Sequence, residues 1–298
     1  MKLGLPGGRN LSCLGIALLL PLVAGCALRS LPVGEPVVGP ARLAVEEEFL
    51  AAMDQRRTRL RCLDAEVEVS WRSLLRSGFL PGYLQMLRPS QLQFIGTDPL
   101  GRPVLALVVA GDRFQLVSVA ETRVYEGPLG AQAFRRHLPG GVTPETLPAS
   151  LFDWFSGGLP FAPEIVAVHR ERALTDGDGG EGAPDSAGTG YWLEVAEPRF
   201  ARLLYSPATD HAPGLVRRIQ LFERRGGAPT EIVYDHYRPV AAADQPGDLP
   251  LPHRIELLSR RHQGLDLTIR LSETQTDCPP TPDFQLPVPR SFTLETVK

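Results

Sequence analysis

The sequence lacks an excess of positive charge. It has 31 Lys and Arg residues against 34 Asp and Glu residues, which gives a net charge of −3. Nucleic-acid-binding proteins need a basic surface that neutralises phosphates, so this composition argues against that class. Six His residues are scattered, and none pairs with Cys or carboxylates at zinc-binding spacing.

Recognisable catalytic patterns are also missing. There is no G-x-S-x-G elbow, phosphate-binding loop or dinucleotide fingerprint. The densest polar group is Tyr-Asp-His-Tyr at 234–237. Strand alternation would place Asp235 and His236 on opposite faces, which would separate any Asp–His pair. We therefore expect no enzyme, no catalytic residue, no metal and no free cofactor.

The first residues have the order of a cleaved signal peptide. Lys2 and Arg9 precede an apolar run at 11–23, and small residues follow it. The run is shorter than the roughly 20 residues that a transmembrane helix needs. We assign residues 1–25 to the signal. Loss of Lys2 and Arg9 would leave 29 basic residues against 34 acidic ones, a net charge of −5.

The end of this signal, Leu-Val-Ala-Gly-Cys at 22–26, resembles a bacterial lipobox. That resemblance implies a diacylglycerol and an acyl chain on Cys26, which would anchor the protein durably to a membrane. Ala27 in place of Asp favours the outer membrane, if the source is Gram-negative. Val23 stands where Leu is more common, and an ordinary secretory signal with a chance cysteine is the alternative.

Two further cysteines are left for the mature chain. Cys13 would leave with the signal, so Cys62 and Cys278 remain in a compartment that permits disulfides. A bridge between them would close a long loop and stabilise the fold by roughly 4–5 kcal/mol. The alternative is two separate thiols.

The N-terminal part of the mature chain changes character at residue 44. Residues 26–43 are rich in Pro, Gly and Val and are interpreted as a flexible tether. Residues 44–60 then place apolar side chains at helical spacing, with acidic residues first and basic residues last. This pattern predicts an amphipathic helix at the start of a body that spans 44–298.

The rest of the body is dominated by short segments in which apolar and polar residues alternate. Such segments, joined by turns rather than long helices, predict an antiparallel meander. Six strands are expected at 63–71, 83–87, 92–95, 104–109, 114–119 and 122–126, then seven at 164–170, 191–195, 202–205, 215–222, 231–237, 254–258 and 265–271, with a short strand near Phe292.

Two short helices are expected between the two groups of strands. One covers 130–138, and the other covers 143–155 and stops at Gly157-Gly158. A flexible insertion is expected at 176–190. Its acidic spacing lacks the full ligand pattern of a calcium loop.

The turn Asp-Pro-Leu-Gly at 98–101 is unusual because Leu100 would occupy its tip, where polar residues are common. Leu100 could also fold back on a neighbouring strand. Together with the Leu-Phe-Asp-Trp-Phe-Ser-Gly-Gly-Leu-Pro segment at 151–160, the lipobox and the element order, this turn resembles the LolB family of outer-membrane lipoprotein receptors.

The resemblance implies a single curved antiparallel sheet that forms an incomplete β-barrel covered by short helices. It further implies a monomer that faces the periplasm from the outer membrane and accepts acylated cargo from a periplasmic lipoprotein carrier. Pro99, Leu100 and Gly101 would form a membrane-inserting turn. An apolar cavity and its lid would be formed by Leu147, Leu151, Phe152, Trp154, Phe155 and Leu159.

The insertion at 176–190 and the Pro-rich tail depart from the family pattern, which leaves the cargo open. The alternative is a structural or adaptor lipoprotein that uses the same fold to dock an envelope complex. The paired arginines, such as Arg217-Arg218, are interpreted as solvated faces, with a docking patch for an acidic partner as the alternative.

Overall fold

The protein divides into two units, Met1–Pro32 and Val33–Lys298. All residues described here belong to the second unit. The computed structural model describes residues 34–72, 77–129, 147–159, 162–171, 190–196, 201–209, 213–222, 229–241, 248–259, 265–277, 286 and 288–297.

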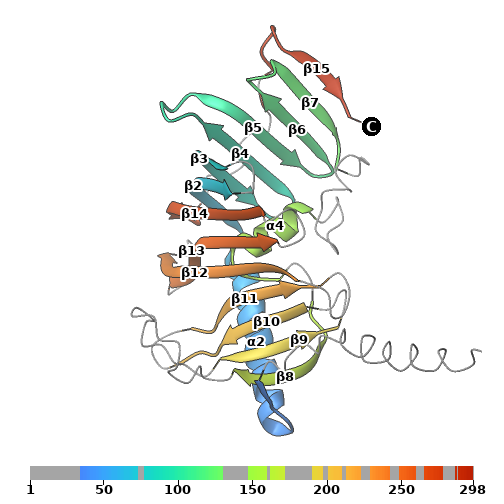
Figure 1. The fold of residues 1–298 in the computed structure, drawn as a ribbon, viewed down its shortest axis with the longest axis vertical. Coiled ribbons are helices and arrows are strands. Elements are labelled where there is room, and N and C mark those ends of the chain that lie inside the picture. Colours follow the sequence, from blue (N-terminus) through green and yellow to red (C-terminus); the bar gives the residue numbers. More distant parts are fainter. Residues whose placement is uncertain are drawn as a thin grey trace, which may run out of the picture. The chain divides into compact units, whose positions relative to one another are not determined.

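The second unit is built on one strongly twisted sheet of 15 strands (Figure 1). Its strand order is β1-β8-β9-β10-β11-β12-β13-β14-β2-β3-β4-β5-β6-β7-β15, so the sheet does not close and β1 and β15 are its edges. The strands are β1 (Gly34–Pro36), β2 (Cys62–Arg72), β3 (Ser77–Leu87), β4 (Gln91–Thr97), β5 (Pro103–Ala110), β6 (Arg113–Ser118), β7 (Arg123–Pro128), β8 (Ile165–Glu171), β9 (Tyr191–Val195), β10 (Ala201–Ser206), β11 (Leu215–Leu221), β12 (Thr230–Ala241), β13 (Asp248–Ser259), β14 (Leu265–Gln275) and β15 (Thr293–Thr296).

The prediction of a mainly β fold with one open sheet and short helices is confirmed. One detail differs, because β15 pairs with β7 in parallel, so the sheet is mixed rather than purely antiparallel. Each strand expected from alternation is present, and β15 is the strand expected near Phe292. Strands β12 and β13 extend beyond their predicted ends through Pro239, Pro250 and Pro252, which obscured the pattern in the sequence.

The segment before the first helix is more ordered than the predicted tether. Strand β1 pairs with β8, and α2 (Pro40–Arg59) begins four residues before the expected boundary at residue 44. Residues 34–36 and 40–43 of the segment assigned to the tether thus belong to a strand and a helix. Pro40 suits the first helical turn because the amide hydrogens there have no intrahelical partner.

Helix α2 covers one half of the sheet. Val45 and Phe49 lie in a hydrophobic cluster with side chains from β8 to β13, and Figure 1 shows α2 running across this half. The Phe49 ring meets the Tyr205 ring edge-on, with 5.2 Å between centroids. The apolar stripe that predicted the helix thus packs on the sheet as expected.

Helix α4 (Leu147–Phe155) covers the other half. Its Phe152 lies in a second cluster that includes Leu84, Met86 and Leu92, while Phe155 packs against both clusters. The helix ends in a Schellman motif, in which the Gly158 amide donates to Asp153 O (2.7 Å) and the Gly157 amide to Trp154 O (3.0 Å). Gly157 has φ +71°, so the predicted stop is confirmed.

Several predicted segments cannot be compared with the fold. The helix expected at 130–138, the first residues of the helix expected at 143–155 and nearly all of the insertion at 176–190 lie outside the described residues, as does the signal at 1–25. Within the described ranges, neither helix combines the length and apolarity that a membrane-spanning helix requires.

Candidate functional site

The β4–β5 turn is held by one side chain. Asp98 Oδ1 accepts hydrogen bonds from the Leu100 and Arg102 amides, at 2.9 and 3.0 Å, and Oδ2 accepts one from Arg102 Nε at 2.7 Å. The Gly101 amide also donates to Asp98 O (2.8 Å), and Gly101 has the left-handed φ of +79°. These hydrogen bonds keep the pKa of Asp98 below its ordinary value, and the bonds from Arg102 have the largest effect.

Leu100 points away from the sheet. It is 79% exposed, the highest fraction among the large hydrophobic side chains of the described residues, so it does not fold back on a neighbouring strand. Gly82 pairs with Gly96, which places Phe79 at the same end of the sheet as the turn. Phe79 is 57% exposed, and this end of the sheet therefore presents more than one apolar side chain.

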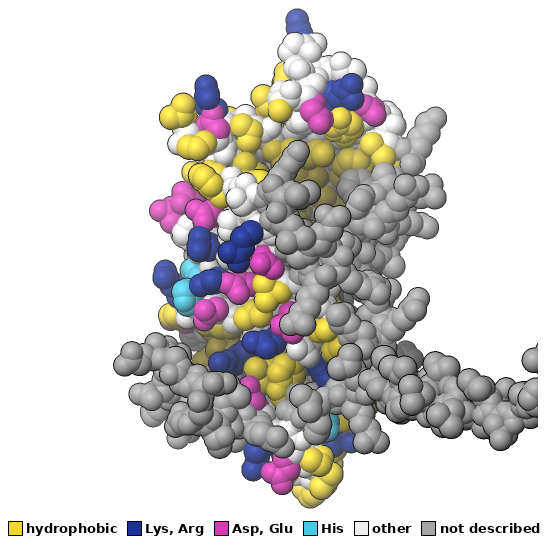
Figure 2. All heavy atoms as spheres, viewed as in Figure 1, with side chains coloured by type: hydrophobic (Ala, Val, Ile, Leu, Met, Phe, Trp, Pro, Cys, Tyr) yellow, Lys and Arg dark blue, Asp and Glu magenta, His cyan; other side chains and the backbone are white. Residues whose placement is uncertain are grey.

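The inner face of β4 to β7 is apolar and half-buried. Four side chains from these strands (Phe94, Leu107, Leu116 and Tyr125) contact the cluster around Phe152 while keeping part of their surface accessible. Figure 2 shows hydrophobic side chains over these strands.

The predicted cavity and lid residues do not all lie together. Phe152 is only 2% exposed and fills the β2–β7 half, while Leu159 is buried in the α2 half. Leu151, Trp154 and Phe155 are half-buried, with Leu151 on the cluster around Phe152 and Trp154 on the cluster around Phe49. The Leu147 side chain lies outside the described part. The apolar side chains of α4 thus form part of the hydrophobic core, whereas those of a simple lid would only cover a cavity.

Three arginines gather at the end of α4. Arg88 Nη2 donates to Asp153 Oδ1, and Arg57 Nη2 lies 3.8 Å from Asp153 Oδ2. Arg56 Nη1 donates to Ser156 O and, at 3.1 Å, to Pro250 O, and Arg57 Nη2 donates to Leu159 O at 3.0 Å. Of these acceptors, the Ser156 carbonyl lies at the end of α4, where carbonyl groups have no intrahelical partner.

Arg56 is the most unusual of the three. It is 4% exposed, and burial lowers the pKa of its guanidinium. Its Nε is buried and has no hydrogen-bond partner among the described residues. A pocket of about 170 Å³ lies beside it, lined by residues of α2, Arg88, the end of α4, and Gly158, Leu159, Ala162 and Pro163.

Sequence reasoning missed this arginine cluster. The basic residues at the end of α2 were interpreted as complements to the helix dipole, which treats them as solvated. The available signal was position, since Arg56 follows Phe49 and Met53 at helical spacing and so falls on the apolar stripe. A charged residue on that stripe must be buried and needs partners.

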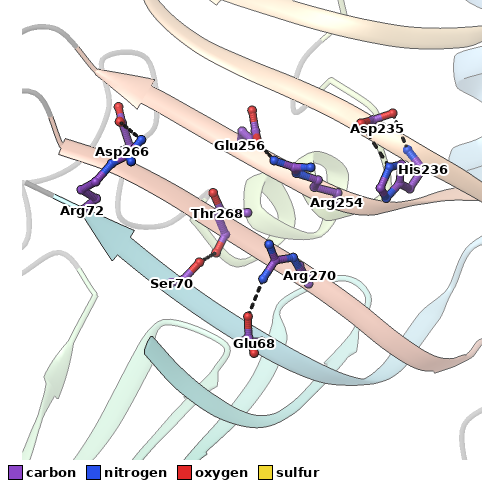
Figure 3. A network of polar contacts seen from close by, with 10 residues as sticks. All are labelled: Glu68, Ser70, Arg72, Asp235, His236, Arg254, Glu256, Asp266, Thr268 and Arg270. Carbon is purple, nitrogen blue, oxygen red and sulfur yellow. Dashed lines mark hydrogen bonds and ion pairs between the residues drawn. The ribbon is translucent and has the colours of Figure 1, made fainter. Parts of the chain in front are cut away.

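The outer face of the sheet is polar and its charges are paired. Figure 3 shows ion pairs between Arg270 and Glu68 (2.7 Å), Arg254 and Glu256, and Arg72 and Asp266 (3.5 Å). Figure 2 shows basic, acidic and His side chains mixed over β12 to β14 and β2. A shallow pocket of about 510 Å³ on this face is lined by both signs of charge.

The expected separation of Asp235 and His236 is wrong. His236 Nε2 lies 3.5 Å from Asp235 Oδ2, and the His236 amide donates to Asp235 Oδ1 at 2.7 Å. His236 has φ +53°, which interrupts the two-residue alternation on which the expectation rested. Both side chains are well exposed, and no group of three or more potential metal ligands occurs in the described ranges.

Cys62 is disulfide-bonded. Its Sγ lies 3.0 Å from the carbonyl oxygen of Thr276, two residues before Cys278. Cys278 and the lipidation residue Cys26 both lie outside the described residues, so the Cys62–Cys278 pairing and the anchor stay predictions.

No protein-family model matches the chain, and no curated protein matches it in sequence. Solved structures with similar folds include a domain described as an outer membrane lipoprotein-sorting protein from Vibrio parahaemolyticus, at 11% identity and TM-score 0.44, covering 77% of this chain and 92% of that one. A LolA superfamily protein from Nitrosomonas europaea is similar at 11% identity and TM-score 0.48, covering 80% and 98%.

A DUF1329 family protein from Desulfovibrio piger is similar at 12% identity and TM-score 0.48, covering 82% of this chain and 96% of that chain. At TM-scores below 0.5, these similarities assign neither a family nor a function to the chain.

Proposed function

We propose that this protein is a LolB-like, outer-membrane-anchored acceptor that takes up acylated cargo and passes it to the membrane without catalysis. The cargo would arrive on a periplasmic carrier, and the anchor would be the lipid predicted on Cys26. Transfer would follow differences in affinity, because each CH₂ group that leaves water gains about 0.8 kcal/mol.

The observation that carries this proposal is the exposed Leu100 on a rigid turn. Exposing a leucine gains nothing for folding, and five hydrogen bonds within the turn keep it there. A leucine held in water at the end of a sheet is suited to contact with an apolar phase. A lipid surface is such a phase, and Phe79 would meet it at the same end.

The inner face supports the acceptor role. Half-buried apolar side chains on β4 to β7 leave hydrocarbon surface accessible, and an acyl chain could cover it. The open edges β1 and β15 leave room for a sheet of this kind to adjust around a ligand, since no strand pairing would have to break.

A second candidate is an adaptor lipoprotein that docks an envelope complex. The burial of Phe152 favours it, because the described interior is then filled by the protein's own aromatic side chain rather than by cargo. An adaptor would neither bind acyl chains nor need Leu100 for delivery.

The test is transfer of a fluorescent diacylated peptide from the purified full chain to lipid vesicles. Leu100→Glu should slow delivery at least about tenfold, because a charge on the turn opposes entry into the apolar phase. Uptake of the peptide should be unchanged.

The matched control is Leu294→Glu, which places the same charge at an exposed leucine on the edge strand β15. It should deliver like the parent protein. Equal delivery by the Leu100 and Leu294 variants would contradict a role of the turn in delivery. If no form of the protein took up the peptide, the acceptor role would be excluded and the adaptor role would remain.

A further inference from the structure

The pocket between α2 and the end of α4 contains a buried cation without a full counter-charge. Arg56 is nearly inaccessible, yet its hydrogen-bond partners among the described residues are the carbonyl oxygens of Ser156 and Pro250, which carry only partial charges. Burying a charge is costly unless it is paired and hydrogen-bonded. Within the described ranges, no carboxylate forms an ion pair with Arg56.

The nearby carboxylate is already used by other cations. Asp153 receives Arg88 and lies near Arg57, so one negative charge faces two guanidinium groups. Asp54 also lines the pocket but is exposed at its rim. With Arg56, Arg57 and Arg88 against Asp54 and Asp153, the lining retains one positive charge.

An unused donor accompanies this charge. Arg56 Nε is buried without a partner in the described part of the chain. The buried Tyr234 Oη likewise has no partner there, but Tyr234 does not line the pocket. The missing component at this site is therefore an acceptor with negative charge.

The rest of the lining is apolar. Leu50, Met53 and Leu159 line the pocket beside the arginines. Its volume of about 170 Å³ suits a small oxyanion followed by a short length of hydrocarbon. A polar end next to an apolar wall is the pattern of a site for an amphiphile.

We propose that this pocket binds an oxyanion, a carboxylate or a phosphate, through Arg56 and Arg57, with the hydrocarbon attached to it lying against Leu50, Met53 and Leu159. Arginine suits this task because its planar guanidinium can donate two hydrogen bonds to one oxyanion. The identity of the oxyanion as the polar end of an acylated ligand rests on the proposed function, whereas the anion site itself does not.

Calorimetric titration of the purified full chain would test this pocket. The probes are octanoate and octyl phosphate as anionic amphiphiles, acetate and inorganic phosphate as free anions, and octyl glucoside below its micelle concentration as a neutral amphiphile. We expect the anionic amphiphiles to bind most tightly and to weaken as ionic strength rises. If acetate and phosphate bound as tightly as the anionic amphiphiles, the anion site would be supported, but its ligands would be free anions.

Arg57→Gln should raise the Kd of octanoate about tenfold, the change expected for losing one charge-assisted hydrogen bond. Arg57 is 48% exposed, so this variant should fold. Arg56→Lys keeps the charge but loses the planar guanidinium that can donate two hydrogen bonds to one oxyanion. This variant should therefore also weaken binding. Arg217→Gln removes an exposed charge from β11 and is the matched control, with no change expected.

Two results would overturn the proposal: octyl glucoside binding as tightly as octanoate, or octanoate affinity that neither arginine variant changes. Failure here can be separated from failure of the proposed function. Leu100→Glu should bind octanoate normally, and arginine-dependent octanoate binding in a protein that delivers no peptide would contradict only the transfer role.

Discussion

At the residue scale, single polar side chains decide the local structure of the sites. Asp98 is half-buried, and it accepts three hydrogen bonds from Leu100 and Arg102 and so determines where Leu100 stands. The exposed position of Leu100 at the tip therefore depends on the carboxylate of Asp98. The sequence indicated the turn, and Asp98 supplies the reason for its rigidity.

The turn should loosen only in strong acid. The pKa of Asp98 is lowered in the folded protein, from an ordinary value of 3.8, chiefly by the Arg102 amide. A lowered pKa means that the contribution of the carboxylate is present above the unfolded value and is lost as pH falls through the folded one. The amide chemical shifts of Leu100 and Arg102 should therefore titrate with a midpoint below 3.8.

The control for this titration is Asp98→Asn, in which the same two amide signals should not titrate in that range. A midpoint at or above the ordinary value in the parent protein would show that the carboxylate is not held as described.

At the scale of elements, helix α4 depends on how it ends. Its Schellman motif requires a left-handed residue at position 157, and the following chain returns Leu159 to the core. A Cβ at Gly157 would lie 2.7 Å from Tyr237 Oη and 3.2 Å from Arg56 Nη1. The helix end, the buried arginine and β12 are therefore fitted to one another.

Gly157→Ala should destabilise the fold by about 2 kcal/mol, because it adds left-handed strain to a close contact. Chemical denaturation measures this change. Gly158→Ala is the matched control, since its Cβ would meet Asp153 O at 3.3 Å and its φ is not left-handed. Equal losses for the two variants would contradict the special role of Gly157.

At the scale of the whole molecule, one covalent link is expected to tie distant parts of the chain together. Cys62 opens β2, and the chain beyond β14 passes its sulfur at Thr276. A bridge to Cys278 would close a loop of more than two hundred residues, and the chain-entropy model then gives about 5 kcal/mol.

Cys62→Ser should lower the free energy of unfolding by about that amount under oxidising conditions. Reductant should destabilise the parent protein similarly and should have no further effect on the variant. Thiol counting provides the independent check, since Cys278 should become reactive in the variant. A Cys278 thiol that is already free in the oxidised parent would exclude the pairing.

Much of the fold could be predicted because local signals were clear. Alternation in segments such as Leu63–Trp71 fixes which side chains face the core, and a slip by one residue would reverse them, so strand identity is strongly specified. The stop at Gly157-Gly158 has a similarly local cause. Strand β1 escaped prediction because it is three residues long and exists only through its pairing with β8.

The sequence by itself determined the order of the strands after β1, the amphipathic helix and the turn at 98–101, since each follows from backbone preferences and neighbouring residues. Only the tertiary structure decided which groups Arg56 meets, that His236 meets Asp235 and that Phe152 fills the interior. The partners of Arg56 include Pro250, which lies far away in the chain. The contact of His236 with Asp235 depends on a positive φ that the strand pattern does not signal. The apolar stripe of α2 indicates that Arg56 is buried, but it identifies none of its partners.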